Sequence, residues 1–355
     1  MIDDELKALR ARIDSIDDAL LQLVSERASI AQQVGRAKKG EKIYRPEREA
    51  QVVRRLREGN PGPLSGDTVE RLIREIMSAC RALEETTRVA YLGPVGTFSQ
   101  QAVHKHFGHE VEALAEADID ACFHAVETGR AEFAMVPVEN STEGAISRTL
   151  DLIVASPLKI CGEVMLPIHQ TLMRKHASLD GIQRVYGHAQ SLAQCMHWLA
   201  THLPDAERVS VVSNSEGARR AAAEPGAATL GSEAAAELYG LAVVESRIED
   251  EASNTTRFLV LGQTDAAPSG RDKTSLVMGA KNQPGAVVKL LQPLADAGIS
   301  MSKLESRPAR GSNWEYLFFV VCQGHRQDST LAAALAEIES RAAFLKILGS
   351  YPAAS

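Results

Sequence analysis

The chain has 355 residues, which is too long for one ordinary domain and suits two or three. Its hydrophobic fraction of 45% and charged fraction of 24% are typical of globular proteins and exclude wholesale disorder. The net charge of −7 argues against a nucleic-acid or anionic-membrane partner, so an anionic ligand must meet locally placed basic groups. The sequence has no apolar run long enough for a transmembrane helix, and its acidic, amphipathic start does not resemble a signal peptide. We therefore expect a cytoplasmic protein.

The cysteine and histidine patterns do not favour a metal site. The three histidines His104, His106 and His109 are close in sequence, but their spacing does not put the three rings on one helical face. We therefore predict no metal there. The cysteines are far apart and odd in number, so we expect buried, reduced thiols at Cys80, Cys122, Cys161, Cys195 and Cys322.

Residues 1–87 contain no strand-like run and predict an all-α unit of three helices. Pro46 begins the second helix, which ends at Gly59, and the third helix begins after residues 65–67. A lone helix as long as the first cannot bury its apolar stripe within a short domain, so we expect a partner chain. The stripe follows alternating spacings of three and four at Leu6, Leu9, Ile13, Ile16, Leu20 and Leu23, and continues at Ile30 and Val34.

Charged residues interrupt the apolar faces of these helices. Arg27 takes the next position of the stripe, where a guanidinium is costly unless an anion or a partner meets it. Lys38 lies about 20° from the same face and about 16 Å further along the helix. Arg48 and Glu49 on the second helix add to this set, as does Glu84, which we expect on the third helix and facing inward. The pattern predicts a pocket for a small anion, and structural ion pairs are the alternative.

The segments ALRARIDSIDDALLQLVSERASIAQQVGRAK and RPEREAQV resemble the all-helical chorismate mutase family over residues 1–87. The resemblance implies an interlocked dimer that selects the compact conformer of chorismate and stabilises charge on its ether oxygen. Cys80 stands where a serine is common, and Glu84 stands where many members have a glutamine and can donate only when protonated. The implied site residues are Arg27 and Arg48 for the carboxylates, Arg10 from the other subunit, Lys38 for the ether oxygen, Glu49 for the ring hydroxyl, and Arg45, Cys80 and Glu84.

From residue 88 to residue 263 short apolar runs alternate with amphipathic helical stretches, which predicts an α/β domain with a largely parallel sheet. The segment is long enough for two lobes. Polar loops follow its strands in AYLGPVGTFS, VPVENSTEGAI and GHAQSLAQC, and NTTRF begins another strand. Because ligands bind at such strand ends in open α/β sheets, we expect a cleft there. Residues 264–272 are predicted to be a polar linker.

The pair ENSTEG and TRF resembles the prephenate dehydratase family. The resemblance implies two lobes like those of type II periplasmic binding proteins. It also implies conversion of prephenate to phenylpyruvate with loss of carbon dioxide and water, without metal or cofactor. Thr256 is the implied catalytic donor to the leaving hydroxide. Gly187 is a departure, because the family often has a serine there. The implied substrate-binding residues are Thr97, Asn140, Ser141, Thr142, Gln194 and Arg257, the last of which also fits a structural ion pair at a strand edge.

Residues 273–355 read as strand, helix, two strands, helix and strand, which is the ferredoxin-like order. The motifs NQPGAV and ESRP within them resemble the ACT family. A docking module for dimerisation is the alternative to a sensor. The resemblance implies a phenylalanine site at the interface of paired ACT domains, formed by Asn282, Gly285, Ala286, Val287, Glu305, Ser306 and Arg307.

Together the three segments indicate a bifunctional enzyme of phenylalanine biosynthesis that L-phenylalanine inhibits, working as a homodimer or a higher homo-oligomer. Its expected ligands are chorismate, prephenate and L-phenylalanine, with no cofactor, nucleic acid or membrane. A non-catalytic amino-acid-binding regulator that uses the two-lobed cleft and the ACT domain is the competing hypothesis. The predicted mutase pocket and the position of Thr256 in a TRF context favour the enzyme.

Overall fold

The computed structural model describes residues 2–37, 44–280, 283–308 and 316–354, so Lys38 and Asn282 lie outside the described residues. The chain forms two compact units. The first contains most of the N-terminal helices together with the short segment Phe107–Glu112, and the second contains residues 88–106 and 113–355 with the start of the second helix. Within the described ranges, no helix is both long and apolar enough to cross a membrane.

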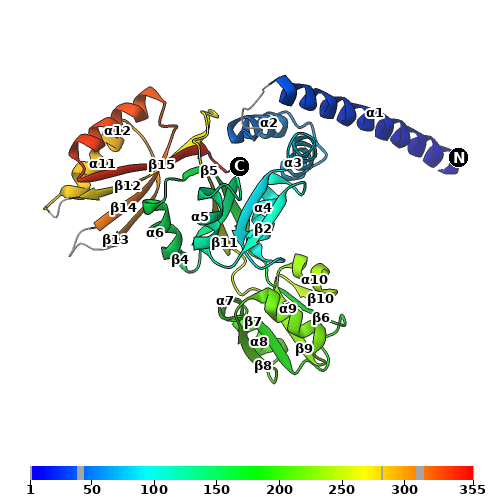
Figure 1. Ribbon diagram of the computed structural model, residues 1–355. Helices are drawn as coiled ribbons and strands as arrows, with labels where there is room; N and C mark the ends of the chain where they lie inside the picture. The colour runs from blue at the N-terminus through cyan, green and yellow to red at the C-terminus, as the bar shows by residue number, and fades with distance from the viewer. Residues whose placement is uncertain (1, 38–43, 281–282, 309–315, 355) are drawn as a thin grey trace. The chain divides into compact units, whose positions relative to one another are not determined.

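Three helices form the N-terminal part of the chain, as the sequence predicts (Figure 1). They are α1 (Ile2–Ala37), α2 (Pro46–Glu58) and α3 (Gly66–Ala82). Ser65 caps α3, because its hydroxyl accepts a hydrogen bond from the backbone N–H of Thr68 at 3.2 Å. Glu84 lies in the turn that follows α3 and not on the helix itself.

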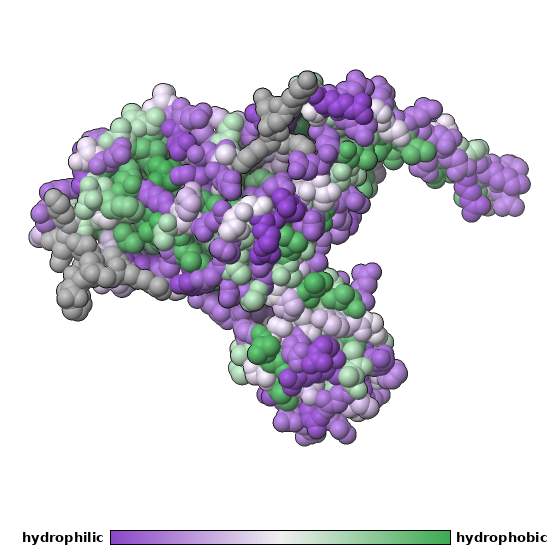
Figure 2. All heavy atoms as spheres, in the orientation of Figure 1, coloured by the Kyte–Doolittle hydropathy of each residue, from purple (hydrophilic) through white to green (hydrophobic). Residues whose placement is uncertain are grey.

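The apolar stripe of α1 faces solvent. Only part of this long helix contacts α3 (Figure 1), and Figure 2 shows hydrophobic side chains along it. Their exposed fractions run from 42% at Leu6 to 63% at Leu23. Large apolar side chains in a continuous row are seldom left in water, which is the physical basis for expecting a second chain. The stripe consists of Leu6, Leu9, Ile13, Ile16, Leu20, Leu23, Ile30 and Val34.

The helical unit includes a short segment beyond residue 87, in addition to most of the residues that the sequence assigns to it. This segment is Phe107–Glu112. Arg81 donates a hydrogen bond from Nη2 to the carbonyl oxygen of Phe107 at 2.6 Å, and the ring of Phe107 lies 5.0 Å from that of Tyr44. His109 contacts Glu75 through Nδ1 at 2.7 Å. A fragment that stops at residue 87 therefore lacks part of its own core.

Two sheets form the two predicted lobes. The first sheet has the order β2-β1-β3-β11-β5, with the short β4 beside β3, and α4, α5 and α6 lie in this lobe. Its strands are β1 (Arg88–Leu92), β2 (Glu112–Glu116), β3 (Phe133–Asn140), β4 (Gly144–Ala145), β5 (Lys159–Pro167) and β11 (Thr255–Gly262). Its helices are α4 (Phe98–Phe107), α5 (Ile119–Glu127) and α6 (Ser147–Ala155).

The second sheet has the order β10-β6-β9-β7-β8. Its strands are β6 (Thr171–Arg174), β7 (Arg184–His188), β8 (Glu207–Val211), β9 (Ala227–Gly231) and β10 (Ala242–Ser246). Its helices are α7 (Ala189–Gln194), α8 (Met196–His202), α9 (Asn214–Ala223) and α10 (Glu233–Tyr239).

The prediction of a largely parallel sheet is wrong, because both sheets are mixed. Strand β1 pairs with β3 in parallel, as does β7 with both β8 and β9. The chain then passes between the lobes and returns, so that β11 runs antiparallel between β3 and β5, and β6 runs antiparallel to β9 and β10. Antiparallel neighbours need no crossover helix, and the strand–helix alternation in the sequence does not reveal them.

The C-terminal part has the predicted ferredoxin-like order, with a sheet arranged β13-β14-β12-β15. Its elements are β12 (Asp272–Ala280), α11 (Ala286–Asp296), β13 (Met301–Pro308), β14 (Tyr316–Gln323), α12 (Ser329–Arg341) and β15 (Phe344–Pro352). The helices cover one face of the sheet. The other face shares the core of the first lobe, where Val277, Phe319 and Tyr351 pack in one cluster with Leu259 and Ile153. Residues 264–272 are packed against this part as well: Ala266 is 4% exposed and its carbonyl contacts Nε2 of the buried His325 at 3.1 Å.

A buried carboxylate joins the sheet of the first lobe to the C-terminal sheet. Glu163 on β5 has a fully buried side chain that accepts hydrogen bonds from Arg257 Nε at 2.9 Å and Lys273 Nζ at 2.6 Å. The backbone N–H of Ala354 donates to it at 3.0 Å, and Tyr351 accepts a hydrogen bond from Arg257 at 3.0 Å. Burial opposes the ionisation of Glu163, but the charges of Arg257 and Lys273 outweigh it and hold the pKa of Glu163 below its usual value.

We predict that Glu163→Gln lowers the free energy of unfolding of the second unit by about 3–5 kcal/mol, because the buried Arg257 and the partly buried Lys273 lose their counter-charge. The pKa of Glu163 is lowered in the folded state. Its contribution to the free energy of unfolding is therefore fully present above the usual carboxyl pKa, and is lost as the pH falls through the pKa of the folded state. Urea unfolding followed by circular dichroism at pH 7 and pH 4 measures both effects.

The control for this prediction is Glu207→Gln, which breaks the exposed pair between Glu207 and Arg184, 67% and 44% exposed. It should change stability by less than about 1 kcal/mol. Equal losses in the two variants, or an unchanged acid dependence in Glu163→Gln, would contradict the prediction.

Candidate functional site

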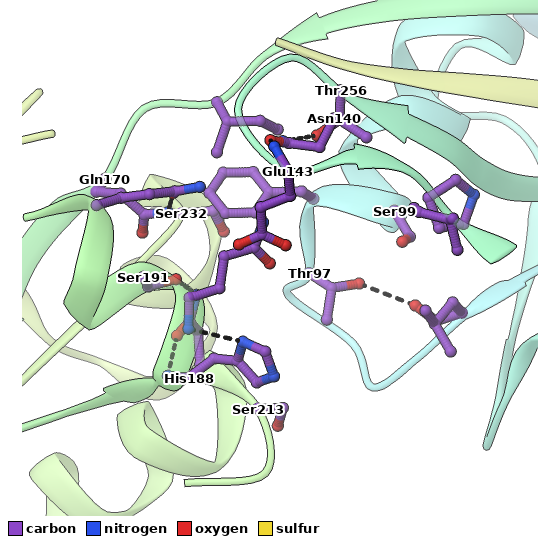
Figure 3. Close-up of a pocket in the computed structure, with 18 of the residues that line it drawn as sticks. Thr97, Ser99, Asn140, Glu143, Gln170, His188, Ser191, Ser213, Ser232 and Thr256 are labelled. Carbon is purple, nitrogen blue, oxygen red and sulfur yellow. Dashed lines mark hydrogen bonds between the residues drawn. The ribbon is translucent and has the colours of Figure 1, made fainter. Parts of the chain in front are cut away.

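A cleft of about 430 Å³ opens between the two lobes, where strand ends and helix starts meet (Figure 3). The first lobe contributes the loop after β1 with the start of α4, the loop after β3, and Thr256 on β11. The second lobe contributes the starts of α7 and α9 and the residue Ser232. Backbone N–H groups at the starts of α4 and α9 favour anions there. None of the described residues that line the cleft is Lys or Arg.

Asn140 and Thr256 form the polar centre of the first lobe (Figure 3). Oδ1 of Asn140 accepts hydrogen bonds from the backbone N–H of Thr142 at 3.0 Å and from its hydroxyl at 2.6 Å, which fixes the orientation of the amide. Nδ2 of Asn140 therefore points to Thr256 and donates to its Oγ1 at 2.8 Å. Since the hydroxyl oxygen of Thr256 is already an acceptor, its own proton is available to a ligand in the cleft.

Four of the predicted dehydratase residues line the cleft, and two act behind it. Thr97, Asn140, Gln194 and Thr256 are lining residues. Thr142 instead holds the amide of Asn140. The Oγ of Ser141 accepts a hydrogen bond from the backbone N–H of Thr255 at 3.0 Å, and so ties the end of β3 to the start of β11.

Arg257 does not line the cleft, which corrects its expected role as a substrate contact. Alternate residues of a strand face opposite sides of the sheet, so Arg257 points away from the face that carries Thr256. Arg257 as a whole is 8% exposed, and its guanidinium pairs with Glu163. The structural ion pair considered for Arg257 from the sequence is the arrangement that the structure shows.

Sequence reasoning missed several lining residues. Ser213 and Ser232 stand directly before α9 and α10, and their position between a strand and a helix is the signal that could have found them. Asn214 lines the cleft and accepts a hydrogen bond from the backbone N–H of His188 at 2.7 Å. Gln170 carries no sequence signal, because it lies in the crossover between the two lobes. Glu143 also lines the cleft.

In the helical unit, a hollow of about 300 Å³ lies where the end of α1 meets the turn after α3. Glu84 is the predicted mutase residue that lines it, together with Gln32, Gly35, Arg36 and Leu83. A Cβ atom added at Gly35 would lie 2.0 Å from Oε2 of Glu84. A glycine at this position therefore lets the carboxyl approach α1 closely.

The other predicted mutase residues are spread over the helices. Arg10 and Arg27 are exposed on α1, about 38 Å and about 12 Å from Gly35 along the helix axis. Arg45 is the exposed N-cap residue of α2, and Arg48 and the half-buried Glu49 follow in its first turn. Cys80 is buried on α3. Arg10 is too far along α1 to reach the hollow of its own chain.

The two ACT motifs lie at one end of the C-terminal sheet. Ala280 at the end of β12 pairs with Tyr316, which also pairs with Pro308 at the end of β13. The NQPGAV segment therefore leaves the sheet beside the ESRP segment. Gly285 adopts φ +74°, a left-handed backbone conformation that favours glycine. Among the described residues, no heavy atom lies within 4 Å of an added Cβ, so a close approach is not the reason for glycine here. The partly buried Ala286 and Val287 follow Gly285 in the first turn of α11.

Strand β13 turns its charged residues toward the first lobe and leaves Ser306 exposed. Lys303 lies 2.9 Å from Oε2 of Glu139 and 3.1 Å from Glu305. Arg307 donates a hydrogen bond to the carbonyl oxygen of Ser147 at 2.8 Å. Glu139 precedes Asn140, so the ESRP strand contacts the back of the segment that carries the cleft residues.

All five cysteines are buried free thiols. In the part of the chain that the structure describes, no three His, Cys, Asp or Glu side chains converge as metal ligands. The three histidines that are close in sequence lie apart in the fold, because His109 contacts Glu75 in the helical unit while His104 and His106 lie on α4.

Comparisons with known proteins match each part of the chain. Residues 9–85 match the family chorismate mutase type II, residues 89–266 match prephenate dehydratase, and residues 274–340 match the ACT domain. Proteins named bifunctional chorismate mutase/prephenate dehydratase are 51% identical in Neisseria gonorrhoeae and 49% in Stutzerimonas stutzeri, each covering 99% of this chain and 98% of the relative. The prephenate dehydratase of Arthrobacter aurescens, solved in complex with L-Phe, has a TM-score of 0.69 at 32% identity, covering 75% of this chain and 90% of that chain.

These matches confirm the three-part fold and the two enzyme domains predicted from the sequence, and they set aside the non-catalytic regulator. The chain belongs to the family of bifunctional chorismate mutases/prephenate dehydratases.

Proposed function

We propose that the helical unit rearranges chorismate to prephenate and that the cleft converts prephenate to phenylpyruvate, under inhibition by L-phenylalanine bound to the ACT domain. The observation that carries the second activity is the hydrogen bond from Asn140 to Thr256, which leaves the Thr256 proton directed to a ligand. We place the enzyme in the cytoplasm, because its five cysteines are free thiols.

The mutase reaction needs no proton transfer and no covalent intermediate. Arg27 and Arg48 bind the two carboxylates of chorismate and hold it in its compact conformer. Glu84 lies at the ether oxygen, and Glu49 holds the ring hydroxyl. Arg45, Cys80 and Lys38 complete the set, with Lys38 at the ether oxygen. The support is the hollow that Glu84 and Arg36 line.

The mutase site takes Arg10 from a second copy of the chain. Arg10 is about 38 Å from the hollow along its own helix, and the exposed stripe of α1 offers the surface for a partner helix. A homodimer in which two α1 helices pair buries this stripe and brings Arg10 of each chain to the site of the other.

In the dehydratase reaction, the bond between the ring and its carboxylate breaks and the electron pair enters the ring. The pair that enters the ring stays there and completes its aromatic system. The bond from the ring to the hydroxyl oxygen breaks at the same time, and its own electron pair goes to the oxygen, which leaves as hydroxide and gains a proton to become water. Thr256 donates a hydrogen bond to the leaving oxygen while Asn140 holds the threonine hydroxyl in place. Formation of an aromatic ring supplies much of the driving force.

The composition of the cleft wall suits a decarboxylation. A guanidinium on the ring carboxylate would stabilise the charge that must leave it, and so would slow the loss of carbon dioxide. The described lining residues include no Lys or Arg. Backbone N–H groups at the starts of α4 and α9, with the nearby side chains of Thr97 and Ser213, bind the anionic substrate with weaker, more distributed charge.

L-Phenylalanine binds where the two ACT motifs meet, with Gly285, Ala286 and Val287 on one side and Glu305, Ser306 and Arg307 on the other. The register of β12, β14 and β13 supports this placement, as does the relative solved with L-Phe. Lys303 shares its charge between Glu305 and Glu139, so a change at Glu305 alters the balance beside Asn140.

Thr256→Ala should lower phenylpyruvate formation from prephenate by about 10²–10⁴-fold, because the leaving hydroxide loses its donor. The chorismate mutase rate of the same preparation should stay within a few-fold of wild type. Thr255→Ala is the matched control, since its side chain lies on the same strand but outside the cleft lining. Full dehydratase turnover in Thr256→Ala would remove this residue from the mechanism, and loss of both activities would indicate misfolding.

Mixing two inactive variants should restore mutase activity. Arg10→Ala and Arg27→Ala chains, unfolded together and refolded, should form mixed dimers with one intact site, giving about a quarter of wild-type activity if pairing is random. Each variant refolded alone should stay inactive. A mixture that also stays inactive, although mixed dimers form, would show that both arginines serve the same subunit.

Lys303→Met should weaken the inhibition of the dehydratase by L-phenylalanine at least about tenfold while calorimetry still detects phenylalanine binding to the full chain. The reason is that the link from Glu305 to Glu139 is lost. Lys175→Met, an exposed lysine in the second lobe, is the control. Unchanged inhibition would refute the link, and loss of binding would place Lys303 in the ligand site.

A further inference from the structure

The crossover between the lobes carries a buried side chain that neither the sequence patterns nor the proposed mechanism uses. Gln170 is 1% exposed and lines the cleft. Its Nε2 donates a hydrogen bond to Oε1 of Gln194 at 3.1 Å. Its own Oε1 is buried and has no hydrogen-bond partner among the residues that the structure describes. A buried acceptor left in this state is destabilising, so the site favours a ligand that supplies a donor.

The backbone around Gln170 is held from both sides. Its N–H donates to Oε2 of Glu249 at 2.8 Å, and its carbonyl oxygen accepts from the N–H of Ile248 at 3.0 Å. Glu249 is itself buried, with a side chain 2% exposed, and its other oxygen contacts His169 at 2.7 Å. The Gln170 side chain is therefore fixed where the two lobes join. Figure 3 shows it extending into the cleft, on the side that faces Asn140 and Thr256.

The chemistry of prephenate selects the group that meets this acceptor. The substrate carries two carboxylates and a ketone, which accept hydrogen bonds, and one ring hydroxyl, which is its single donor. We propose that Oε1 of Gln170 accepts a hydrogen bond from the ring hydroxyl of prephenate. This assignment rests on the proposed dehydratase function of the cleft.

This contact orients the leaving group. The hydroxyl proton points to Gln170, so a lone pair of the same oxygen is turned toward the Thr256 donor. No proton moves to Gln170. When the bond from the ring to the oxygen breaks, the oxygen keeps its own proton, which is hydrogen-bonded to Gln170. It gains a second proton and leaves as water. Gln170 is thus a specificity residue for a hydroxylated ring, and its contact is lost when phenylpyruvate forms.

The product separates this role from a purely structural one, because phenylpyruvate lacks the ring hydroxyl. In the full-length Gln170→Met variant, kcat/KM for prephenate should fall about tenfold or more. The inhibition constant for added phenylpyruvate should stay within about twofold of wild type. The chorismate mutase rate of the same sample reports the integrity of the chain, and Gln183→Met, an exposed glutamine outside the cleft lining, is the matched control.

Either of two results in Gln170→Met would overturn the assignment. An unchanged kcat/KM would show that Gln170 does not touch the substrate, and an equal loss of phenylpyruvate binding would place it at the pyruvyl side chain or in a structural role. Gln170→Asn gives a second measurement if the methionine variant binds neither compound. It keeps the amide but withdraws the acceptor by one methylene, and it should show the same selective loss for prephenate. If Gln170→Asn weakens the use of prephenate and the binding of phenylpyruvate equally, the proposal is also wrong. The chorismate mutase rate of this variant shows whether the chain is folded.

Discussion

The carboxylate of Glu163 is the interaction on which the second unit of the chain depends. A fully buried charge is tolerated only when opposite charges and hydrogen-bond donors surround it, and here they come from several elements. Arg257 comes from β11, Lys273 from β12 and a backbone N–H from Ala354 near the C-terminus. Each element must be in place for the others to be stable, which ties the ACT sheet to the first lobe.

This constraint also determines which side chains of β11 face the cleft. Because neighbouring side chains on β11 face opposite sides of the sheet, the burial of Arg257 against Glu163 turns Thr256 toward the cleft. The Asn140 amide, held by Thr142, then fixes the Thr256 hydroxyl. The regulatory strand β13 reaches the same segment from behind, through Lys303 and Glu139. The sheet of the first lobe therefore separates the contact between Lys303 and Glu139 from the proposed catalytic residue Thr256.

The two proposed sites treat anionic substrates in different ways, and the difference follows from the two reactions. In the mutase both carboxylates survive the rearrangement, so arginines can hold them without opposing the reaction. In the dehydratase one carboxylate leaves as carbon dioxide, and a strong cation beside it would stabilise the reactant. Exposed arginines on the helices and a cleft whose described lining residues include no Lys or Arg match these opposite needs.

Short-range residue patterns in the sequence determined many of the helices and strands. Pro46 and Ser65 mark the starts of two helices, and the alternation in residues 273–355 predicts the ferredoxin-like order that the structure shows. Polar residues at strand ends are a short-range pattern and predict the cleft, and the resemblance of ENSTEG and TRF to a known family singles out Asn140 and Thr256, which line it.

The tertiary structure decided which face each strand presents and which distant segments meet. Thr256 and Arg257 are neighbours on a strand and so face opposite sides of its sheet, but which of the two meets the cleft depends on Glu163, 94 residues from Arg257. The sequence likewise carries no sign of Gln170, whose place in the cleft depends on the crossover between lobes, or of the segment Phe107–Glu112 in the helical unit. Burial and long-range pairing come from the packed chain, and no local spacing encodes them.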